Sequence, residues 1–183
     1  DAGSGEPVGG PLTGQKDWVL TVAFSPDGKT LASGSCAVRN ENQECTEGEI
    51  LLWDLAKRQP IGQPLTGHTN WVNSVAFSPD GNRLATSSFD GTLKIWEVAT
   101  GRKIISIQRT PTGQRGGSVA FSPDGGSVAS MASTVDGDVV RVWDAADGTD
   151  LFSWKPPGSA QILLDVAFGP DGKWLASFGS SGA

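Results

Sequence analysis

Ala23-Phe24-Ser25-Pro26-Asp27-Gly28 decides the fold, because this segment returns three more times along the chain. The further copies are Ala76–Gly81, Ala120–Gly125 and Ala167–Gly172, the last with Gly169 in place of the serine. The four phenylalanines of these copies lie 53, 44 and 47 residues apart. Self-similarity at such a spacing indicates a repeat protein.

A second motif, an apolar run ending in Trp-Asp or Trp-Glu, follows each of the first three copies at Ile50–Asp54, Leu93–Glu97 and Val139–Asp144. The distance from the preceding Ser or Thr to the tryptophan explains the uneven spacing. It is 20 residues for Ser33 and Trp53, 10 for Thr86 and Trp96, and 13 for Ser130 and Trp143. The underlying period is therefore about 43 to 44 residues, with insertions confined to one loop.

Short runs of alternating apolar and polar residues within one period predict four strands. In the second repeat these runs are Ser74–Phe77, Arg83–Thr86, Leu93–Trp96 and Lys103–Ile107. The Ser-Pro-Asp-Gly segment predicts the first hairpin, since proline presets φ for a turn and glycine accepts a positive φ. Four antiparallel strands in each period are typical of a propeller blade.

The second repeat resembles a complete repeat of the WD40 family. The residues that carry the resemblance are Gly67-His68, Trp71-Val72, Phe77–Gly81, Leu84–Thr86, Asp90–Thr92 and Trp96-Glu97. The resemblance implies an all-β WD40 β-propeller, as a partial array of about four blades of four antiparallel strands. The sequence of residues 58–68 is most similar to the repeats of bacterial WD40 arrays, which are often fused to signalling NTPases, kinases or proteases.

We expect residues 1–183 to form a single array of repeats. Residues 1–14 are the expected last strand of a preceding blade, because Gly5–Gly14 repeats part of 58–68. Blade 1 is expected at 15–67, blade 2 at 68–113, blade 3 at 114–156 and an incomplete blade 4 at 157–183. Each blade buries its faces against its neighbours. The chain is therefore either a fragment of a longer array or a partial array that assembles with itself.

The composition argues against several classes of function. A net charge of -6, with no long Lys or Arg cluster, gives no source for binding nucleic acid. No run approaches the ~20 apolar residues of a membrane span, and the N-terminus lacks the pattern of a signal peptide. With one His, no Tyr and no metal-ligand spacing, we expect no enzyme activity, no cofactor and no bound metal.

The WD40 resemblance implies that His68, Thr86, Asp90 and Trp96 form a buried hydrogen-bonded chain that ties the loops of blade 2 together. A His beside an Asp and a hydroxyl also invites comparison with a hydrolase triad. The structural interpretation is favoured, because the single His of the chain stands at a repeat position. Gln15 and Gln114 replace this His in blades 1 and 3, so we expect weaker ties there.

Two further motifs suggest ligands but favour plain turns. Residues 23–30, ending in Lys29-Thr30, satisfy a relaxed Walker A pattern. A phosphate cradle needs free backbone amides and a following helix, whereas the pattern predicts a following strand. Asp136-Gly137-Asp138 could suggest calcium, but that ion requires at least about six oxygen ligands, so a hydrated turn is expected.

Cys36 and Cys45 flank a polar excursion at Ser35–Gly48 that holds ten extra residues. We expect an exposed loop, for which two alternatives remain open: a disulfide that closes it, or two free thiols in a reducing cytosol. A cytoplasmic location is favoured with free thiols, and an extracytoplasmic one if the cysteines are bonded.

The WD40 resemblance implies that a partner is recognised at two places in each blade. These are the start of the first strand and the residue just before the aspartate of the loop between the second and third strands. The corresponding residues are Trp18, Leu20, Trp71, Asn73, Phe89, Arg115, Val135, Ile162 and Leu164. Exposed aromatic and Arg side chains are typical of interfaces.

The expected function is a non-catalytic module that binds a protein or peptide or senses a ligand. The alternatives are a platform for an enzyme whose catalytic domain lies elsewhere, and a structural array that self-assembles through open blade edges.

Overall fold

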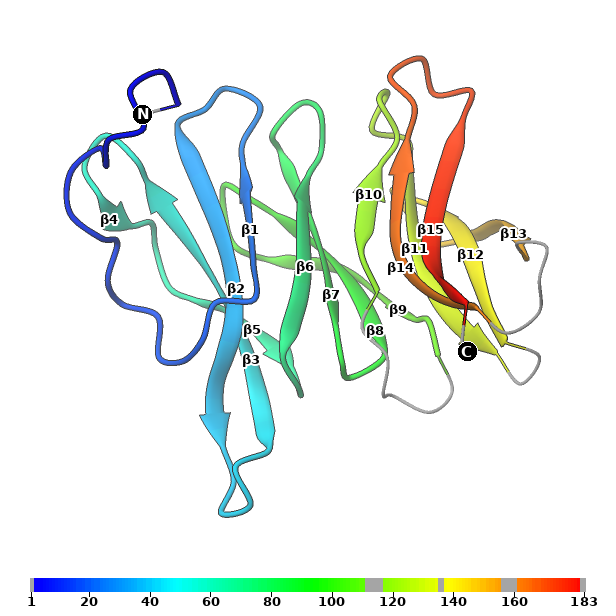
Figure 1. Ribbon diagram of the computed structural model, residues 1–183, viewed down its shortest axis with the longest axis horizontal. Helices are drawn as coiled ribbons and strands as arrows, with labels where there is room; N and C mark the ends of the chain where they lie inside the picture. Colours follow the sequence, from blue (N-terminus) through cyan, green and yellow to red (C-terminus); the bar gives the residue numbers. More distant parts are fainter. Residues whose placement is uncertain (1, 111–116, 135–136, 156–160, 182–183) are drawn as a thin grey trace.

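The computed structural model describes residues 2–110, 117–134, 137–155 and 161–181, and it confirms the all-β prediction. The described residues form fifteen strands in four antiparallel sheets, with no helix among them. Successive sheets stand side by side along the chain, as the blades of a propeller do (Figure 1). No helix capable of crossing a membrane is present in this part of the chain.

The first sheet, blade 1, contains β1 (Thr21–Phe24), β2 (Thr30–Arg39) and β3 (Cys45–Asp54), followed by β4 (Gln59–Pro60) and β5 (Leu65–His68). Both β4 and β5 pair with β3, so together they form one interrupted outer strand. Proline has no N–H for a strand ladder. Pro60 and Pro64 therefore explain why this outer strand is broken.

The remaining sheets follow the same order of strands. Blade 2 contains β6 (Val72–Phe77), β7 (Arg83–Ser88), β8 (Thr92–Glu97) and β9 (Lys103–Gln108). Blade 3 contains β10 (Val119–Phe121), β11 (Ser127–Thr134), β12 (Gly137–Asp144) and β13 (Asp150–Trp154). Blade 4 contains β14 (Gln161–Phe168) and β15 (Leu175–Ser181).

Each Ser-Pro-Asp-Gly segment forms the hairpin between the first two strands of its blade. In blade 1 the amide of Ser25 donates to the Thr30 carbonyl over 2.8 Å. The Asp27 carboxylate accepts from the Ser25 hydroxyl at 2.6 Å and from the Lys29 amide at 3.0 Å. Gly28 has the positive φ, 68°, that closes the turn. The Walker-like segment thus uses its amides within its own hairpin and is followed by a strand.

The hydrophobic core lies between neighbouring blades. Ile50 and Leu52 of blade 1 pack with Val72, Val75 and Leu84 of blade 2. Equivalent clusters join blade 2 to blade 3 and blade 3 to blade 4. Stability therefore depends on contacts between successive repeats, as in other repeat proteins.

The face of blade 1 that points away from blade 2, which we call its outer face, is exposed. In each later blade the equivalent face packs against the preceding blade. Val22 is 57% exposed, whereas its repeat equivalents Val75, Val119 and Val166 are buried. Phe24 is 65% exposed, whereas the equivalent Phe121 is 9% exposed. The apolar flank expected of an open array is therefore present in this chain.

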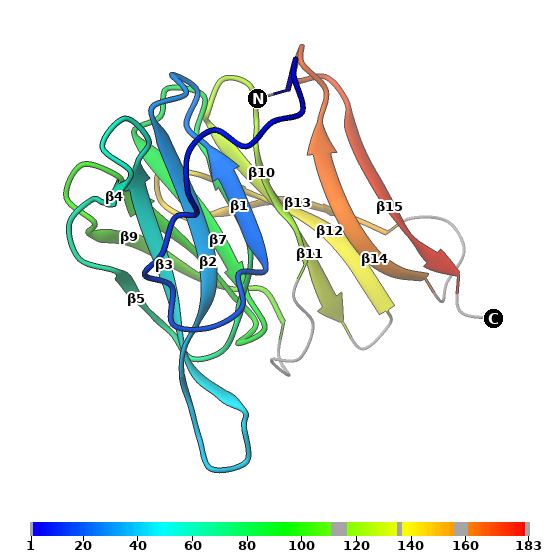
Figure 2. The same cartoon turned by 60° about the vertical axis from the view of Figure 1, so that its left-hand side comes forward.

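Two expectations need correction. Residues 2–14 contain no strand, because none of the described strands pairs with them. Arg58 instead donates to the carbonyls of Val8 and Gly10. The ten extra residues of blade 1 do not form a loop, since they lengthen β2 and β3 into a hairpin that projects beyond the blades (Figure 2).

Candidate functional site

The loops of blade 2 are held by a chain of four buried side chains that the structure brings together. The Trp96 indole N–H donates to Thr86 Oγ1 over 2.9 Å, and Thr86 Oγ1 lies 2.8 Å from Nε2 of His68. Nδ1 of His68 lies 2.8 Å from Asp90 Oδ2. Asp90 also accepts from the Thr69 amide at 3.0 Å. The chain therefore fixes the segment just before β6 against the turn between β7 and β8.

The environment of His68 favours a neutral imidazole. Burial lowers the pKa of His68 below its usual 6.5, because desolvation disfavours the charged ring. With its proton on Nδ1, the imidazole donates a hydrogen bond to Asp90 and accepts one from the Thr86 hydroxyl at Nε2. Although burial by itself raises the pKa of Asp90, hydrogen bonds from His68 and Thr92 hold it well below 3.8. The cluster has the donors and acceptors of a structural tie, with its hydroxyl buried at 0% exposure.

Blade 1 makes the same kind of tie with a glutamine. The Trp53 indole donates to Ser33 Oγ at 2.8 Å, and Ser33 donates to the Gln15 carbonyl oxygen at 2.8 Å. The Gln15 amide donates to Ser35 Oγ at 2.7 Å. Gln15 thus completes a tie that we expected to be weakened, because its amide offers one acceptor and one donor, as a neutral imidazole does.

Glu49 takes over the acceptor role of the loop aspartate in blade 1. Its carboxylate accepts from the Lys16 amide at 3.2 Å, as Asp90 accepts from the Thr69 amide. Glu49 lies in β3 and is 1% exposed. No sequence motif indicates Glu49, because it is displaced from the loop position where the family pattern places an aspartate.

Arg109 joins blade 2 to blade 3. Its guanidinium donates to the carbonyls of Ser88 at 3.0 Å and Met131 at 2.7 Å, and to Ser130 Oγ at 3.1 Å. Burial lowers the pKa of Arg109 to about 10, so it stays charged at neutral pH. No sequence motif indicates this role. Gln114, the predicted His substitute of blade 3, lies outside the described residues.

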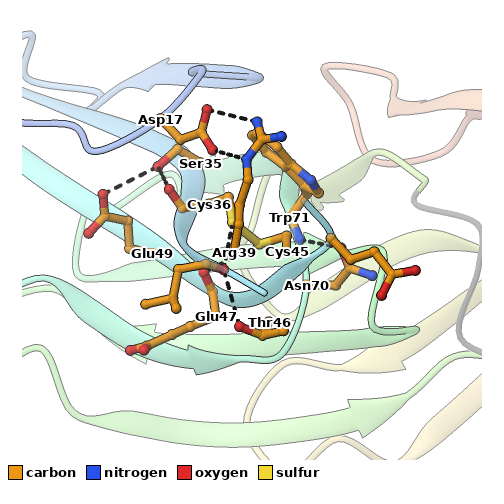
Figure 3. Close-up of a disulfide and its surroundings, with 12 residues drawn as sticks. Asp17, Ser35, Cys36, Arg39, Cys45, Thr46, Glu47, Glu49, Asn70 and Trp71 are labelled. Atoms are coloured by element: carbon orange, nitrogen blue, oxygen red, sulfur yellow. Dashed lines mark hydrogen bonds and ion pairs between the residues drawn. A yellow bond between two sulfur atoms is a disulfide. The ribbon is translucent and has the colours of Figure 1, made fainter. Parts of the chain in front are cut away.

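The projecting hairpin of blade 1 is crossed by a disulfide between Cys36 and Cys45. Arg39 lies close to this disulfide, and its guanidinium points at the Asp17 carboxylate (Figure 3). Nη2 of Arg39 donates to Asp17 Oδ1 over 2.9 Å, and Nε donates to Oδ2. A two-point contact of this kind orients the guanidinium as well as holding it.

Arg39 also connects two of the tryptophans predicted to bind a partner. Its guanidinium carbon lies 5.9 Å from the ring centroid of Trp18 and 4.9 Å from that of Trp71. Both distances are within the range of a cation–π contact. We call Trp18, Arg39 and Trp71 the Trp-Arg-Trp cluster. Trp18 is 74% exposed and Trp71 is half-buried, so the cluster presents one well-exposed aromatic ring beside the hairpin.

The other predicted partner-binding residues are placed differently. Asn73 is half-buried and its amide donates to the Gly117 carbonyl of the next blade at 3.2 Å. Phe89 is half-buried after β7, and its amide donates to the Trp71 carbonyl at 3.0 Å. Leu20 is 44% exposed just before β1. The structure therefore places Phe89 beside the cluster and uses Asn73 between blades.

The remaining predicted positions lie in or near the later blades. Leu164 is 51% exposed in β14 of blade 4. Ile162 pairs through its backbone with Ser180. Arg115 and Val135 lie outside the described residues. Of the residues considered for calcium, Asp136 is also outside them, and Asp138 accepts from Ser133 Oγ at 2.7 Å and from the Leu163 amide at 3.1 Å.

These features define a class of protein, an array of β-propeller blades whose loops are tied by buried Trp–hydroxyl–His or Trp–hydroxyl–Gln chains. Residues 5–54 and 58–97 match the family model described as "WD domain, G-beta repeat". The chain therefore carries repeats of the WD40 family.

Relatives of this chain include proteins of plants and of an insect. A guanine nucleotide-binding protein subunit beta of Oryza sativa subsp. indica is 38% identical over 93 residues, 48% of this chain and 22% of the relative. Small ribosomal subunit protein RACK1y of Oryza sativa subsp. japonica is 31% identical over 126 residues, 68% of this chain and 31% of the relative. Protein groucho of Drosophila melanogaster is 32% identical over 111 residues, 56% of this chain and 14% of the relative.

The chain thus spans at most 31% of the length of these three relatives. Because all three are eukaryotic proteins, they do not support the expected similarity to bacterial arrays fused to signalling enzymes. What they share with this chain is the WD40 repeat itself.

Replacing His68 tests the tie of blade 2 and its dependence on pH. His68→Ala is expected to lower the free energy of unfolding by about 1 to 3 kcal/mol at pH 7.5, because buried partners lose their hydrogen bonds. In the unchanged protein the folded state resists protonation of His68, while the unfolded state binds a proton near pH 6.5. Stability is therefore expected to fall as the pH drops below 6.5, as measured by urea unfolding at several pH values.

His68→Gln is the matched control, because Gln15 makes the equivalent tie in blade 1. We expect it to retain more stability than His68→Ala at pH 7.5 and to lose the His68 part of the pH dependence. An equal slope between pH 6.5 and 5 in the unchanged protein and in His68→Gln would contradict this assignment.

Proposed function

We propose that this chain is a non-catalytic protein-interaction scaffold and that the Trp-Arg-Trp cluster recognises a protein or peptide partner. The observation that carries the proposal is the 74% exposure of Trp18 in a cluster that the blade holds in one arrangement. Large aromatic rings contribute most to an interface when a partner desolvates them.

The cluster is suited to recognition because it is ordered before a partner arrives. Asp17 holds Arg39 by two hydrogen bonds, and Arg39 contacts both tryptophan rings. The amide of Trp71 donates to the Asn70 side chain at 2.8 Å, which fixes the backbone below the ring. A surface that is already ordered loses less conformational entropy on binding.

The relatives support a role in assemblies. Two of them are named as parts of larger particles, a subunit of a guanine nucleotide-binding protein and a protein of the small ribosomal subunit.

The disulfide supports a location outside the reducing cytosol, because disulfides persist in oxidising compartments. We therefore propose that the interaction takes place in an oxidising compartment.

Substitution of both tryptophans tests the proposed function. Trp18→Ala combined with Trp71→Ala is expected to weaken partner capture by about 30-fold or more, since interface hot spots are typically worth at least about 2 kcal/mol. The readout is quantitative affinity capture of interacting proteins, followed by titration of each captured protein against both forms of the chain.

Trp174→Ala is the matched control, because Trp174 is also 74% exposed but lies just before β15, in the hairpin that joins β14 to β15. Partners of the cluster should be retained by this variant and lost by the double variant. The proposal fails if every captured protein binds the double variant and the unchanged chain equally, with both folded by circular dichroism.

A second candidate function, homotypic association, is favoured by the uncovered outer face of blade 1. Val22 and Phe24 occupy positions whose equivalents pack between blades in the rest of the array. A matching blade face from another copy would bury them in the same way. Sedimentation velocity over a concentration series distinguishes this association from a monomer.

A further inference from the structure

The hairpin that carries Arg39 is irregularly paired at the point where the disulfide crosses it. Cys36 pairs with Gly48, Val38 with Glu47 and Arg39 with Cys45. Two register shifts separate these three pairs, and neither Ala37 nor Thr46 has a partner in the register. Bulges of this kind interrupt the ladder of backbone hydrogen bonds. The disulfide therefore joins the two strands where their backbone pairing is weakest.

Beyond the bulges, few hydrogen bonds join the two strands of the hairpin to each other. Its turn is closed by the Asn40 amide donating to the Glu44 carbonyl at 2.9 Å and the Gln43 amide donating to the Asn40 carbonyl at 3.0 Å. Thr46 Oγ1 donates to the Val38 carbonyl at 3.2 Å. These residues are mostly exposed, so water competes for the same hydrogen bonds. An isolated two-stranded hairpin is marginally stable at best.

The body of blade 1 does not depend on the disulfide. Regular pairing of β2 with β3 continues from Cys36 and Gly48 back to Thr30 and Asp54. The tie of Trp53, Ser33 and Gln15 lies within this regular part. Loss of the disulfide is therefore expected to release the hairpin end and leave the blade folded.

We propose that oxidation of Cys36 and Cys45 assembles the Trp-Arg-Trp cluster, so that the surface is available only when the disulfide is formed. This inference rests on the proposed function and names its regulation. Without the disulfide, Arg39 leaves its place between Trp18 and Trp71, and the pair of rings loses the cation that holds it. The folded blade is retained in both states.

The reaction is a thiol–disulfide exchange with a low-molecular-weight disulfide. In the forming direction the two cysteine thiols give up two electrons and two protons, the bond between Cys36 Sγ and Cys45 Sγ forms, and the small disulfide is reduced to two thiols. In the reverse direction a dithiol such as dithiothreitol breaks the protein disulfide and becomes a cyclic disulfide. Its thiolate attacks at Cys45, which is 7% exposed, whereas Cys36 is 0% exposed.

Fluorine NMR of the protein labelled with 5-fluorotryptophan tests the inference without a partner. Resonances are assigned by single Trp→Phe changes. Reduction with dithiothreitol is expected to shift the signals of Trp18 and Trp71 and to leave those of Trp53 and Trp96 in place. Hydrogen exchange at residues 38–47 is expected to speed up by about tenfold or more, because the disulfide no longer limits opening of the hairpin.

The Arg39→Ala change tests whether loss of Arg39 from the cluster causes the shifts of the Trp18 and Trp71 signals. In the oxidised protein this change is expected to reproduce the shifts at Trp18 and Trp71, and reduction of the Arg39→Ala protein is expected to add little further shift. The double change Cys36→Ser and Cys45→Ser should match the reduced protein. Reoxidation should restore the original signals of the unchanged chain.

Two outcomes overturn the inference. Unchanged Trp18 and Trp71 signals after reduction would show that the cluster persists without the disulfide. Shifts that extend to Trp53 and Trp96 would show that reduction disrupts the blades. Neither result bears on whether the tryptophans bind a partner, because partner capture by the oxidised double Trp variant tests that separately.

Discussion

Trp96→Ala is expected to lower the free energy of unfolding by about 3 to 5 kcal/mol, the range for removing a large buried aromatic side chain. Trp96 is 2% exposed and belongs to the apolar cluster between blades 1 and 2. Its indole N–H also donates to Thr86 Oγ1 at 2.9 Å. The substitution thus opens a cavity between two blades and removes one end of the tie that holds the blade 2 loops.

Two further variants make this test specific, with urea unfolding as the measurement. Trp96→Phe keeps most of the ring but loses the donor, so a smaller loss of about 1 to 2 kcal/mol is expected. Trp174→Ala removes an exposed tryptophan and should change stability by no more than about 0.5 kcal/mol. If Trp96→Ala cost as little as Trp174→Ala, the interface between blades 1 and 2 would not support the fold. Should Trp96→Ala fail to fold, Trp96→Phe still measures the contribution of the tie.

Gly48→Ala is the second substitution with a large expected effect, a loss of about 3 kcal/mol at the upper end of overpacking changes. A Cβ at Gly48 would lie 2.2 Å from the backbone carbonyl oxygen of Asn70 and 3.0 Å from Val72 Cγ2. The obstacle is backbone of the adjacent blade, which a rotamer change cannot move. Relief requires β3 to separate from the segment that carries Trp71, so the Trp-Arg-Trp cluster should be disturbed as well.

Gly10→Ala is the matched control, because a Cβ there meets no atom within 4 Å. It is expected to change the free energy of unfolding by no more than about 0.5 kcal/mol. Equal stabilities for the two variants, measured under the same conditions, would mean that the close approach of Gly48 to blade 2 does not constrain the protein.

Different repeats form the same kind of hydrogen-bonded tie with different side chains. Blade 2 uses His68 and Asp90 in its tie, whereas blade 1 uses Gln15 and Glu49. Arg109 crosses from blade 2 to reach Ser130, which occupies the tie hydroxyl position of blade 3. What the fold requires at these positions is therefore a set of donors and acceptors, and more than one residue type supplies them.

Local sequence was sufficient to predict the strands of blade 2 and their order. The runs predicted for blade 2 fall within β6 to β9, and the Ser-Pro-Asp-Gly segments form the first hairpins. These features depend on backbone preferences and on alternating polarity over a few residues, which a single sequence contains. Residues 2–14 were predicted wrongly as a strand, because a strand also requires a neighbour and local sequence does not supply one.

The sequence alone determined the repeat, the hairpin turns and the residue types available for the tie of blade 2, because each repeats at a fixed distance along the chain. Only the tertiary structure decided that Arg39 of the inserted hairpin lies between Trp18 and Trp71, and that Arg109 bridges two blades. The contacts of Arg39 follow no repeat, since Arg39 stands in the insertion and its guanidinium is held by Asp17. Contacts between residues distant in sequence depend on how blades pack and how strands are bulged, and those properties are set by the whole array.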